Sequence, residues 1–548
     1  MDNLRTLFIF GLLIVSLLLW EAWQKDYVRP QQQTAQPAGE MSEPGQAAAQ
    51  YELPELPVAQ HSDALPDLPQ AEHASAAAGK VHVKTDVMDV QIGTQGGDIR
   101  NLALLKYAVS SEQPDVPVEF LNDAAGLFFV TQSGLRSDTA APTHYEIYRA
   151  EQQDYILQDG QDELKVPLYW QAPNGLQVIK TYTFKRDSYV VNVDYQVTNR
   201  SGERFSAYPY AQFNRNRADD GSTFIYTYTG AVFSSEGNEY EKVDFDQLDD
   251  EGSFNRSVTD GWAAMIQHYF VAAIVPAQNN EQKAFYGKSI NGTNYTAGVR
   301  MPAIQVAAGE QANTGYEMYL GPKKHDRLEK VAENLPLTVD YGMLTIISEP
   351  LFWIMQWIHK LTGNWGWSIV FLTILIKLAF FRLSAASYRS MAAMRKLTPK
   401  LASLKERYGD DKQKFNQAMM ELYRTEKINP LGGCLPILVQ MPVFLAFYWV
   451  LVESIELRQA DFMLWIHDLT AMDPYFILPV LFGISMWFQQ KLNPAPQDPA
   501  QAMMMKIFPL VFTVFFAFFP AGLVLYWVVN NALSIAQQWY ITRKMDAI

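Results

Sequence analysis

The chain has 548 residues, of which 49% are hydrophobic, and it carries a formal net charge of −14. This length allows two or three domains. The acidic balance argues against a basic nucleic-acid-binding surface, so we expect no DNA partner. The only cysteine, Cys434, excludes a disulfide within the chain, and we interpret it as a small buried apolar residue.

Apolar residues and charges are distributed unevenly along the chain. Residues 1–350 contain one long apolar run, at the N-terminus, whereas residues 351–548 contain most of the others. Residues 24–350 hold 25 Lys and Arg against 44 Asp and Glu. This asymmetry predicts an acidic, water-exposed half followed by a membrane half.

The N-terminal apolar run covers residues 7–20 and follows Arg5. A cleaved signal peptide would end in small residues, but Trp20, Glu21 and Trp23 follow this run. We therefore predict an uncleaved transmembrane anchor in residues 1–24, with its Trp residues at the interface. Residues 25–79 are rich in Gln, Pro, Ala and Glu, which predicts a disordered linker.

Residues 80–335 have the pattern of an all-β sandwich. Short runs rich in β-branched and aromatic residues recur, and Gly, Asn or Asp often separates them. The carboxylates and the residues His82, His144 and His268 are scattered, without metal-ligand spacing. A scaffold or docking role is therefore favoured over a carbohydrate site, although both stay open. The predicted strand runs are residues 81–84, 180–195, 224–228, 269–275 and 295–299.

Residues 336–363 join the two halves. Apolar residues within 348–361 are interspersed with Gln356, His359 and Lys360, which predicts an amphipathic helix lying in the outer interface of the membrane. The alternative is an early start to the next span. We favour the separate helix because Gly363 and the residue after it interrupt the apolar run.

Five further membrane spans are predicted after this helix. Residues 507–540 are too long for one span of about 20 residues, and Pro520 and Gly522 near the middle predict a turn. The spans are therefore residues 364–381, 431–452, 475–490, 507–519 and 523–540, which makes six with the anchor.

The charges of the loops predict the orientation of the spans. Residues 382–430 carry 11 Lys and Arg against 5 Asp and Glu, whereas residues 453–474 carry one Arg against 5 acidic residues. By the positive-inside rule the first loop is cytoplasmic and the second lies outside. Both termini are then cytoplasmic, and residues 25–350 lie outside.

Residues 383–428 are predicted to form a cytoplasmic helical hairpin. Apolar residues recur every three or four positions on both sides of Gly409, and Pro399 should kink the first helix. Basic residues on the outer face are either a solvated surface or a docking surface for ribosomal RNA, anionic lipid or a nascent chain. The candidate docking residues are Arg395, Lys396, Lys400, Lys405, Arg407 and Lys412.

Lys377 lies inside the apolar span 364–381. An ammonium group at bilayer depth costs roughly 3 kcal/mol on insertion scales, so such a charge usually marks a functional site. Thr373 lies on the same helix face, and other spans contain Gln440, Gln490 and Asn530. Each alone is more typical of helix–helix hydrogen bonding, but together with Lys377 they predict a hydrated cavity. We expect no metal, cofactor or nucleotide, because metal-ligand spacing and a phosphate-binding loop are both missing from the sequence.

Several segments of the second half carry a specific resemblance. They are residues 409–412 (GDDK), 429–442 (NPLGGCLPILVQMP), 464–469 (LWIHDL), 473–479 (DPYFILP) and 519–527 (FPAGLVLYW). These segments, and the start MDNLRTLFIF, closely resemble the YidC membrane protein insertases. The anchor, the linker and the large external β domain resemble the Gram-negative branch of that family.

The resemblance implies a five-helix membrane core with a hydrophilic groove that opens to the cytoplasm and the lipid but is closed on the outside. It also implies an external β supersandwich similar to sugar mutarotases. Lys377 then corresponds to the groove charge, and Thr373 and Trp527 correspond to groove-lining positions. Gln440 and Gln490 are further groove positions, and Asn530 joins them as a polar residue of the sixth span.

The resemblance further implies a protein of the bacterial inner membrane that is not an enzyme. The family inserts and folds nascent membrane proteins, alone or with the Sec translocon. The ribosome or the signal-recognition machinery would contact the cytoplasmic face, and membrane lipids would surround the core.

The chain departs from the family pattern at two positions. Bacterial members usually have Arg where this chain has Lys377, and lysine keeps the charge but loses the planar fork of donors. They often have Pro where Arg382 stands, and this change would move the cytoplasmic end of the second span and add a second cation nearby.

Two other classes of protein remain as alternatives. A secondary transporter also keeps a charge at membrane depth, but it usually contains internal repeats, and we find none in this sequence. A membrane-anchored carbohydrate-binding or carbohydrate-active protein would place its chemistry in residues 80–335.

Overall fold

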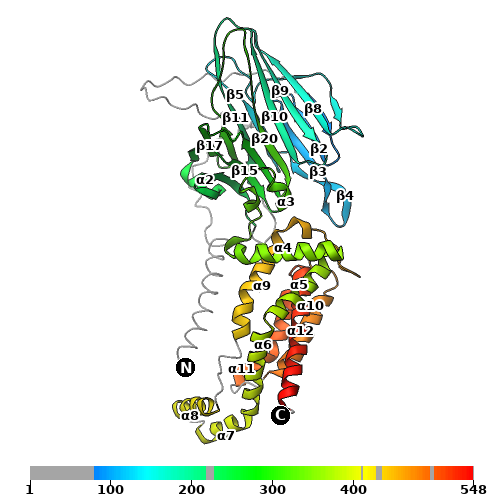
Figure 1. The fold of residues 1–548 in the computed structure, drawn as a ribbon, viewed down its shortest axis with the longest axis vertical. Helices are drawn as coiled ribbons and strands as arrows, with labels where there is room; N and C mark the ends of the chain where they lie inside the picture. Colours follow the sequence, from blue (N-terminus) through cyan, green and yellow to red (C-terminus); the bar gives the residue numbers. More distant parts are fainter. Residues whose placement is uncertain (1–78, 218–226, 409–410, 427–434, 494–498, 547–548) are drawn as a thin grey trace, which may run out of the picture.

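The computed structural model describes residues 79–217, 227–408, 411–426, 435–493 and 499–546. These residues form a β domain and a helical domain, one above the other, with helix α4 lying across the boundary (Figure 1). The predicted anchor (1–24) and the predicted linker up to residue 78 lie outside the described residues, as does most of the strand run 224–228.

The strands of the β domain form three sheets of five, nine and six strands. In spatial order the first is β4 (Gln113–Leu121), β3 (Asp98–Ser110), β2 (Met88–Gly93), β1 (Lys80–Lys84) and β7 (Asp154–Ile156). The second is β13 (Asn238–Val243), β12 (Gly230–Ser235), β15 (Trp262–Gln267), β16 (Phe270–Pro276), β20 (Gln311–Pro322), β10 (Val190–Asn199), β9 (Leu176–Lys185), β8 (Glu163–Gln171) and β6 (Arg149–Ala150). The third is β14 (Ser253–Val258), β17 (Lys283–Ile290), β18 (Asn294–Arg300), β11 (Phe205–Asn216) and β19 (Ile304–Val306), with β5 (Phe129–Arg136) paired to β11.

Alternation along the strands explains how they build the core. On β10, Val191, Val193 and Tyr195 are buried while the residues between them are at least partly exposed, as expected for a strand with one face on a core. The predicted run 180–195 is two strands rather than one. Asp187 adopts a left-handed conformation with φ 49°, which reverses the chain between antiparallel β9 and β10.

A buried ion pair lies inside the β domain. Lys180 Nζ donates to Asp98 Oδ1 at 2.9 Å, and the two side chains are 0% and 3% exposed. The ammonium also lies 5.4–5.8 Å from the ring centroids of Tyr148, Tyr182 and Tyr195. Burial raises the pKa of Asp98 to about 6, although Lys180 opposes that shift.

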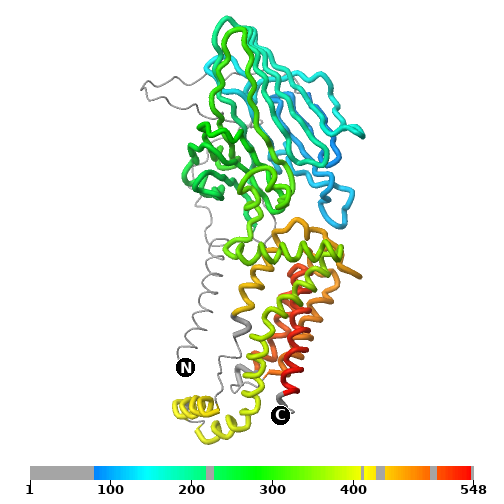
Figure 2. Tube along the Cα trace, viewed as in Figure 1, coloured from blue at the N-terminus to red at the C-terminus, as the bar shows by residue number. Residues whose placement is uncertain are grey.

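Nine helices form the described helical domain. They are α4 (Thr345–Thr362), α5 (Trp365–Ala379), α6 (Phe381–Lys396), α7 (Thr398–Tyr408), α8 (Lys412–Thr425), α9 (Leu435–Glu453), α10 (Ile477–Leu492), α11 (Pro499–Phe516) and α12 (Ala521–Asp546). The last of these, red in Figure 2, lies beside α5 and α6. Short helices outside this set are α2 (Phe245–Glu251), α3 (His325–Leu328), η2 (Leu335–Thr338), η3 (Gly342–Leu344) and η5 (Ile455–Leu457).

The helix boundaries follow local chemistry. Gly363 ends α4 in the left-handed conformation, and the Asn364 side chain accepts from the Trp367 N–H and caps α5. The predicted break at Pro520 is present, because α11 ends at Phe516 and α12 begins at Ala521. Pro399 does not kink one helix as predicted. Instead α6 ends at Lys396 and α7 starts afresh, with Pro399 in its first turn, where a missing N–H costs least.

In the part of the chain that the structure describes, no single helix is both long enough and apolar enough to cross a bilayer. Helices α5 and α6 meet that requirement only as a pair, and they bend by 67° at their junction. Residues Val439–Glu453 and Met503–Phe516 are shorter apolar helices.

Candidate functional site: a polar pocket around Lys377

Lys377 lies in the last turn of α5, directly before the bend into α6. Its side chain is half-buried, and Nζ donates to Ser534 Oγ of α12 at 2.8 Å. The bend at Phe380 turns the chain away from the α5 axis, so that residues of both helices border the same space. Lys377 therefore lies where α5 meets α6, and its side chain also contacts α12.

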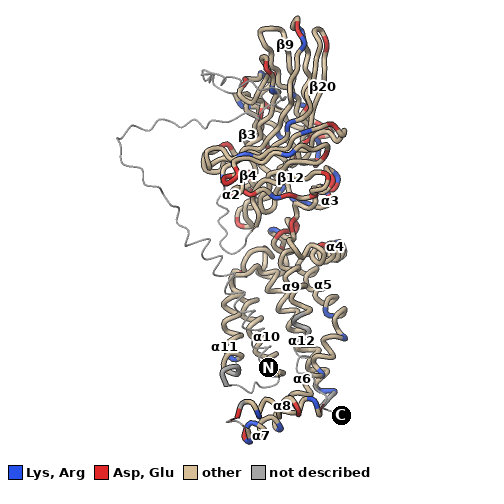
Figure 3. The backbone as a smooth tube through the Cα atoms, turned by 90° about the vertical axis from the view of Figure 1, so that its left-hand side faces the viewer, with Lys and Arg blue, Asp and Glu red and all other residues tan. Residues whose placement is uncertain are grey.

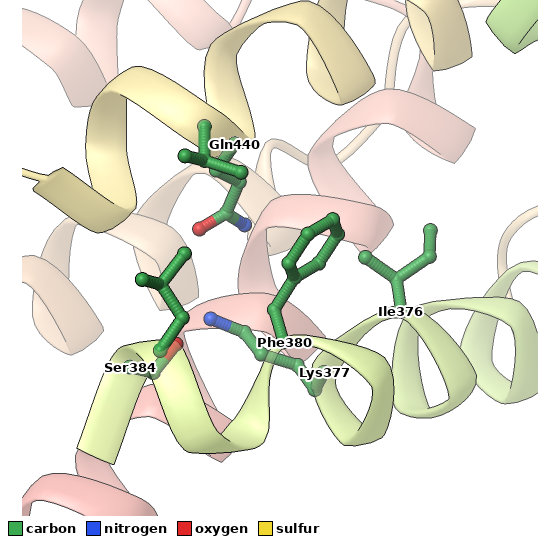
Figure 4. Close-up of a pocket in the computed structure, with 7 residues that line it drawn as sticks. Ile376, Lys377, Phe380, Ser384 and Gln440 are labelled. Carbon is green, nitrogen blue, oxygen red and sulfur yellow. The ribbon is translucent and has the colours of Figure 1, made fainter. Parts of the chain in front are cut away.

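Lys377 lines a small pocket, where the space between atoms is about 280 Å³ if open solvent is counted. Figure 4 shows the amino group of Lys377 and the amide of Gln440 pointing into the same space, with Ser384 beside it. Apolar residues form the remaining walls. The lining residues are Ile376, Lys377, Phe380, Leu383 and Ser384 from α5, α6 and their junction, and Val439 and Gln440 from α9.

Hydrogen bonds join Lys377 to Gln440 through α12. Gln440 Nε2 donates to Asn530 Oδ1 at 2.5 Å. The hydroxyl of Ser534, which accepts from Lys377, donates to the Asn530 carbonyl at 2.7 Å. Because Asn530 and Ser534 are four residues apart, they lie on one face of α12. Three helices thus contribute to one connected polar group.

The Lys377 ammonium is only partly satisfied by the described residues. It forms one hydrogen bond, to a neutral hydroxyl, and no ion pair with any of them. An ammonium carries three donors, so it can still bind water or a carboxylate. This arrangement suits transient attraction of an acidic group rather than a permanent salt bridge.

The other predicted groove residues lie outside the pocket. Thr373 is buried and donates to the Ile369 carbonyl of its own helix at 2.7 Å. Gln490 is half-buried near the end of α10. Trp527 packs against Phe444, whose ring centroid is 4.8 Å away, and its buried Nε1 has no acceptor among the described residues. The pocket therefore brings together Lys377 and Gln440, with Asn530 behind them.

Sequence reasoning missed Ser384 and Ser534, because a serine inside a helix is usually unremarkable. The spacing carried a signal, since Asn530, Ser534 and Gln538 recur every four residues on one face of an apolar helix. That polar stripe continues past the pocket, where Gln538 Nε2 donates to Asn493 Oδ1 at 3.0 Å.

The predicted basic docking residues lie at the opposite end of the helical domain from the β domain. Figure 3 shows Lys and Arg gathered along the end of α6 and on α7 and α8. Lys400 Nζ forms an ion pair with Glu426 Oε1 at 2.6 Å. The structure does not describe the side chain of Lys412. The exposed members of the predicted set are Arg395, Lys396, Lys400, Lys405 and Arg407.

Two of the resembling segments, LWIHDL and DPYFILP, build the loop at 454–476 rather than the pocket. Trp465 Nε1 donates to Asp473 Oδ1 at 3.0 Å, and Asp473 Oδ2 accepts from the Leu478 N–H at 2.7 Å. The same loop accepts from the start of α12, where Gly522 N donates to the Leu469 carbonyl at 2.8 Å. The loop therefore joins α10 and α12 at the end of the helical domain that faces the β domain.

A second contact joins this loop to α5. Asn364 Nδ2 donates to the Phe462 carbonyl at 2.9 Å. A Cβ added at Gly366 would overlap the Phe462 ring, so only glycine allows this close packing.

Comparisons with known proteins match both halves of the chain. The family model of the YidC periplasmic domain matches residues 80–354, and the model of the 60Kd inner membrane protein matches residues 357–547. Proteins named membrane protein insertase YidC from Nitrosococcus oceani and Methylococcus capsulatus are each 49% identical, and the alignments cover 100% of this chain and 99% of theirs. A solved structure described as an active YidC insertase matches 85% of this chain and 95% of its own at 18% identity, with a TM-score of 0.39. On the family models and the two relatives, this chain belongs to the YidC family of inner-membrane protein insertases.

Proposed function

We propose that the chain inserts hydrophobic segments into the inner membrane through a polar groove centred on Lys377, by a process that breaks no covalent bond. The observation that carries this proposal is the half-buried ammonium, which bonds a neutral hydroxyl and leaves donors for a client. A structural lysine in an apolar region would instead be expected to have a carboxylate partner.

In the proposed mechanism, the apolar and polar parts of a client take different places on the helical domain. The hydrophobic segment of a nascent membrane protein slides along the lipid-facing side of the helices. Its short polar tail, often acidic, rests transiently beside Lys377, Gln440 and the hydroxyls around them. Partitioning of the apolar segment drives the step, and the membrane potential assists acidic tails.

Six spans with cytoplasmic termini and a periplasmic β domain fit this mechanism. Helix α5 has 15 residues, which at about 1.5 Å per residue is shorter than a typical hydrocarbon core of about 30 Å. A locally thin membrane would shorten the distance that the polar tail must cross. The charge asymmetry of residues 382–430 and 453–474 supports the orientation.

The basic surface on α6 and α7 is proposed to receive the ribosome or the signal-recognition machinery. Its exposed Arg and Lys residues suit the phosphates of ribosomal RNA. A neighbouring Sec translocon would deliver those clients that need it, and other clients would enter alone.

The test measures insertion of a single-span client with an acidic tail by Lys377→Arg, Lys377→Ala and Lys377→Glu variants. We expect Lys377→Arg to keep most of the activity. Lys377→Glu should lose about tenfold or more, because about 1.4 kcal/mol of lost attraction is enough for a factor of ten.

The matched control is Lys491→Glu, which reverses an exposed charge on α10 outside the pocket. This control should insert the client normally. Full activity of Lys377→Glu would rule out charge attraction, and equal losses in both variants would reduce the effect to net charge alone.

A further inference from the structure

The hydroxyl of Ser534 is fixed as a hydrogen-bond acceptor. Ser534 Oγ donates to the Asn530 carbonyl, one turn earlier on α12, at 2.7 Å. A hydroxyl has one proton and two acceptor lone pairs. Because its proton is used by the carbonyl, the oxygen can only accept at its other positions. Lys377 Nζ donates to that oxygen at 2.8 Å, so the serine offers the ammonium an acceptor of fixed direction.

Ser534 lies on a well-packed part of α12. Its side chain and that of Asn530 are 3% and 4% exposed, and α12 contacts both α5 and α6. Lysine, by contrast, has a flexible four-carbon stem. Among the described residues, Ser534 is the single hydrogen-bond partner of the Lys377 ammonium. Without this hydroxyl, no described residue would fix the place of the ammonium within the pocket.

The partner of Lys377 is neutral, which leaves the positive charge available. A carboxylate at this place would form an ion pair with the ammonium, as Asp98 does with Lys180 in the β domain. Such a pair would compete with the carboxylate of a client for the same charge. A serine hydroxyl holds the ammonium but does not cancel its charge. Ser534 therefore combines a fixed position with an unpaired charge.

The same turn of α12 also holds the opposite wall of the pocket. Gln440 Nε2 donates to Asn530 Oδ1 at 2.5 Å, and Figure 4 shows that the Gln440 amide and the Lys377 amino group point into the same space. Further along α12, Gln537 Nε2 donates to the Phe381 carbonyl at the start of α6, at 3.1 Å. The placement of the ammonium relative to the pocket is therefore set from α12.

We infer that Ser534 is a positioning residue that determines the preference of the groove for clients with acidic tails. It holds the Lys377 ammonium at the pocket and leaves the charge of that ammonium unpaired. This inference rests on the proposed function and adds to it a residue that acts through Lys377. Ser534 itself does not contact the client.

The experiment compares two single-span clients that differ only in their short tails. One tail carries aspartates, and the other carries asparagines at the same positions. The amount of each client that the full-length protein inserts is measured, and the ratio of acidic to neutral client is the readout. The variants are Ser534→Ala, Ser534→Thr and Ser534→Asp.

The matched control is Ser485→Ala on α10. Ser485 Oγ also donates to a carbonyl of its own helix, that of Phe482, at 2.6 Å. It also accepts from a side chain of a neighbouring helix, because Asn531 Nδ2 of α12 donates to it at 3.0 Å. The hydrogen-bonding arrangement is the same, but no charged group takes part. This variant should keep the ratio of the parent.

We expect Ser534→Ala to lower the ratio roughly threefold to tenfold, the range that the net contribution of one hydrogen bond predicts. Insertion of the neutral client should stay within error of the parent. Ser534→Thr should keep the ratio, because a threonine hydroxyl in a helix can form the same bond to a carbonyl of the preceding turn. Ser534→Asp should lower the ratio as far as Lys377→Ala does, because its carboxylate would pair with the ammonium.

A double variant tests whether Ser534 acts through Lys377. In the Lys377→Ala background, Ser534→Ala should cause no further change in the ratio, because the group that it positions is already missing. A purely structural serine would instead cause the same loss in both backgrounds and with both clients.

Four results would overturn the inference. The first is a parental ratio in Ser534→Ala, and the second is an equal loss of both clients in that variant. The third is a lowered ratio in Ser534→Thr while the neutral client inserts normally. The fourth is a lowered ratio in the Ser485→Ala control, which would show that loss of any serine contact between helices is sufficient.

Failure of this inference can be told apart from failure of the proposed function. If Lys377→Ala keeps the parental ratio, charge attraction by the groove is wrong, and the role of Ser534 falls with it. If Lys377→Ala lowers the ratio but Ser534→Ala does not, the groove charge stands and only the positioning role is lost.

Discussion

Lys180 of the β domain and Lys377 of the helical domain are both withdrawn from water, but their surroundings differ. Lys180 meets a carboxylate at 2.9 Å and three aromatic rings, all inside a packed core. Lys377 meets one serine hydroxyl and borders an open pocket. The charge of Lys180 is paired with Asp98 inside the β domain and has a structural role. In the proposed mechanism the charge of Lys377 attracts an acidic group of the client.

The largest effect on stability should follow from removing Lys180, the partner of the buried Asp98 carboxylate. Lys180→Met leaves Asp98 buried without its cation, so we expect a loss of about 3–5 kcal/mol in the unfolding free energy of the β domain. Denaturant unfolding of the full chain, followed by a probe in the β domain, measures it.

Two controls accompany this prediction. Lys165→Met removes a lysine that is 62% exposed and should change little. Combining Lys180→Met with Asp98→Leu should recover much of the loss. A change below about 1 kcal/mol in Lys180→Met would mean that the Asp98 carboxyl tolerates burial alone.

A smaller effect is expected from pH, through Asp98 of that ion pair and the buried His144 near it. Burial lowers the pKa of His144 from 6.5 to about 3, so its contribution to stability is present above pH 6.5 and is lost as the pH falls toward 3. The raised pKa of Asp98 acts in the opposite direction, because its contribution grows as the pH falls from about 6 toward 3.8. In the parent protein these two trends largely offset each other.

Replacing His144 separates the two trends. Between pH 7 and pH 4, His144→Gln should gain about 3 kcal/mol relative to the parent, because one pKa unit corresponds to about 1.4 kcal/mol. Denaturant midpoints of both proteins across that range give the difference. Parallel pH curves would show that His144 is not held neutral by burial.

The smallest effect, and opposite in sign to that of Lys180, concerns Lys377. Replacing an unpaired buried charge by an apolar side chain is often stabilising, so Lys377→Met should raise the stability of the helical domain by about 1–3 kcal/mol. The same variant should insert less client. Thermal unfolding in lipid, set beside the insertion assay, tests both; reduced stability together with reduced insertion would make Lys377 structural, like Lys180.

Local chemistry made much of the fold predictable from the sequence. Gly363 and Asn364 set the boundary between α4 and α5, and the interruption at Pro520 separates α11 from α12. Alternating side chains indicated strands in the β domain. The turn at Asp187 escaped prediction although four polar residues, 185–188, interrupt the β-branched and aromatic pattern there.

Long-range contacts could not be predicted from one sequence. Lys180 and Asp98 are 82 positions apart, and Lys377 and Ser534 are 157 apart. Lys377 stood out because an apolar run surrounds it, whereas Ser534 was marked only by its spacing from Asn530 and Gln538. The contacts between the two domains could not be predicted for the same reason, since His268 donates to the Val452 carbonyl and Lys323 donates to Glu453 across the domain boundary.

The contact between Gly366 and Phe462 has a consequence for the electrical integrity of the membrane. The proposed mechanism places a water-filled groove in the bilayer, and such a groove is a path for protons unless one end is sealed. The Phe462 ring lies on α5 where glycine leaves room for it, and it belongs to the loop that contacts α5 and α12 at their ends nearest the β domain. Replacing Gly366 by a larger residue would displace the Phe462 ring from α5. We expect this replacement to dissipate the proton gradient before it impairs client insertion.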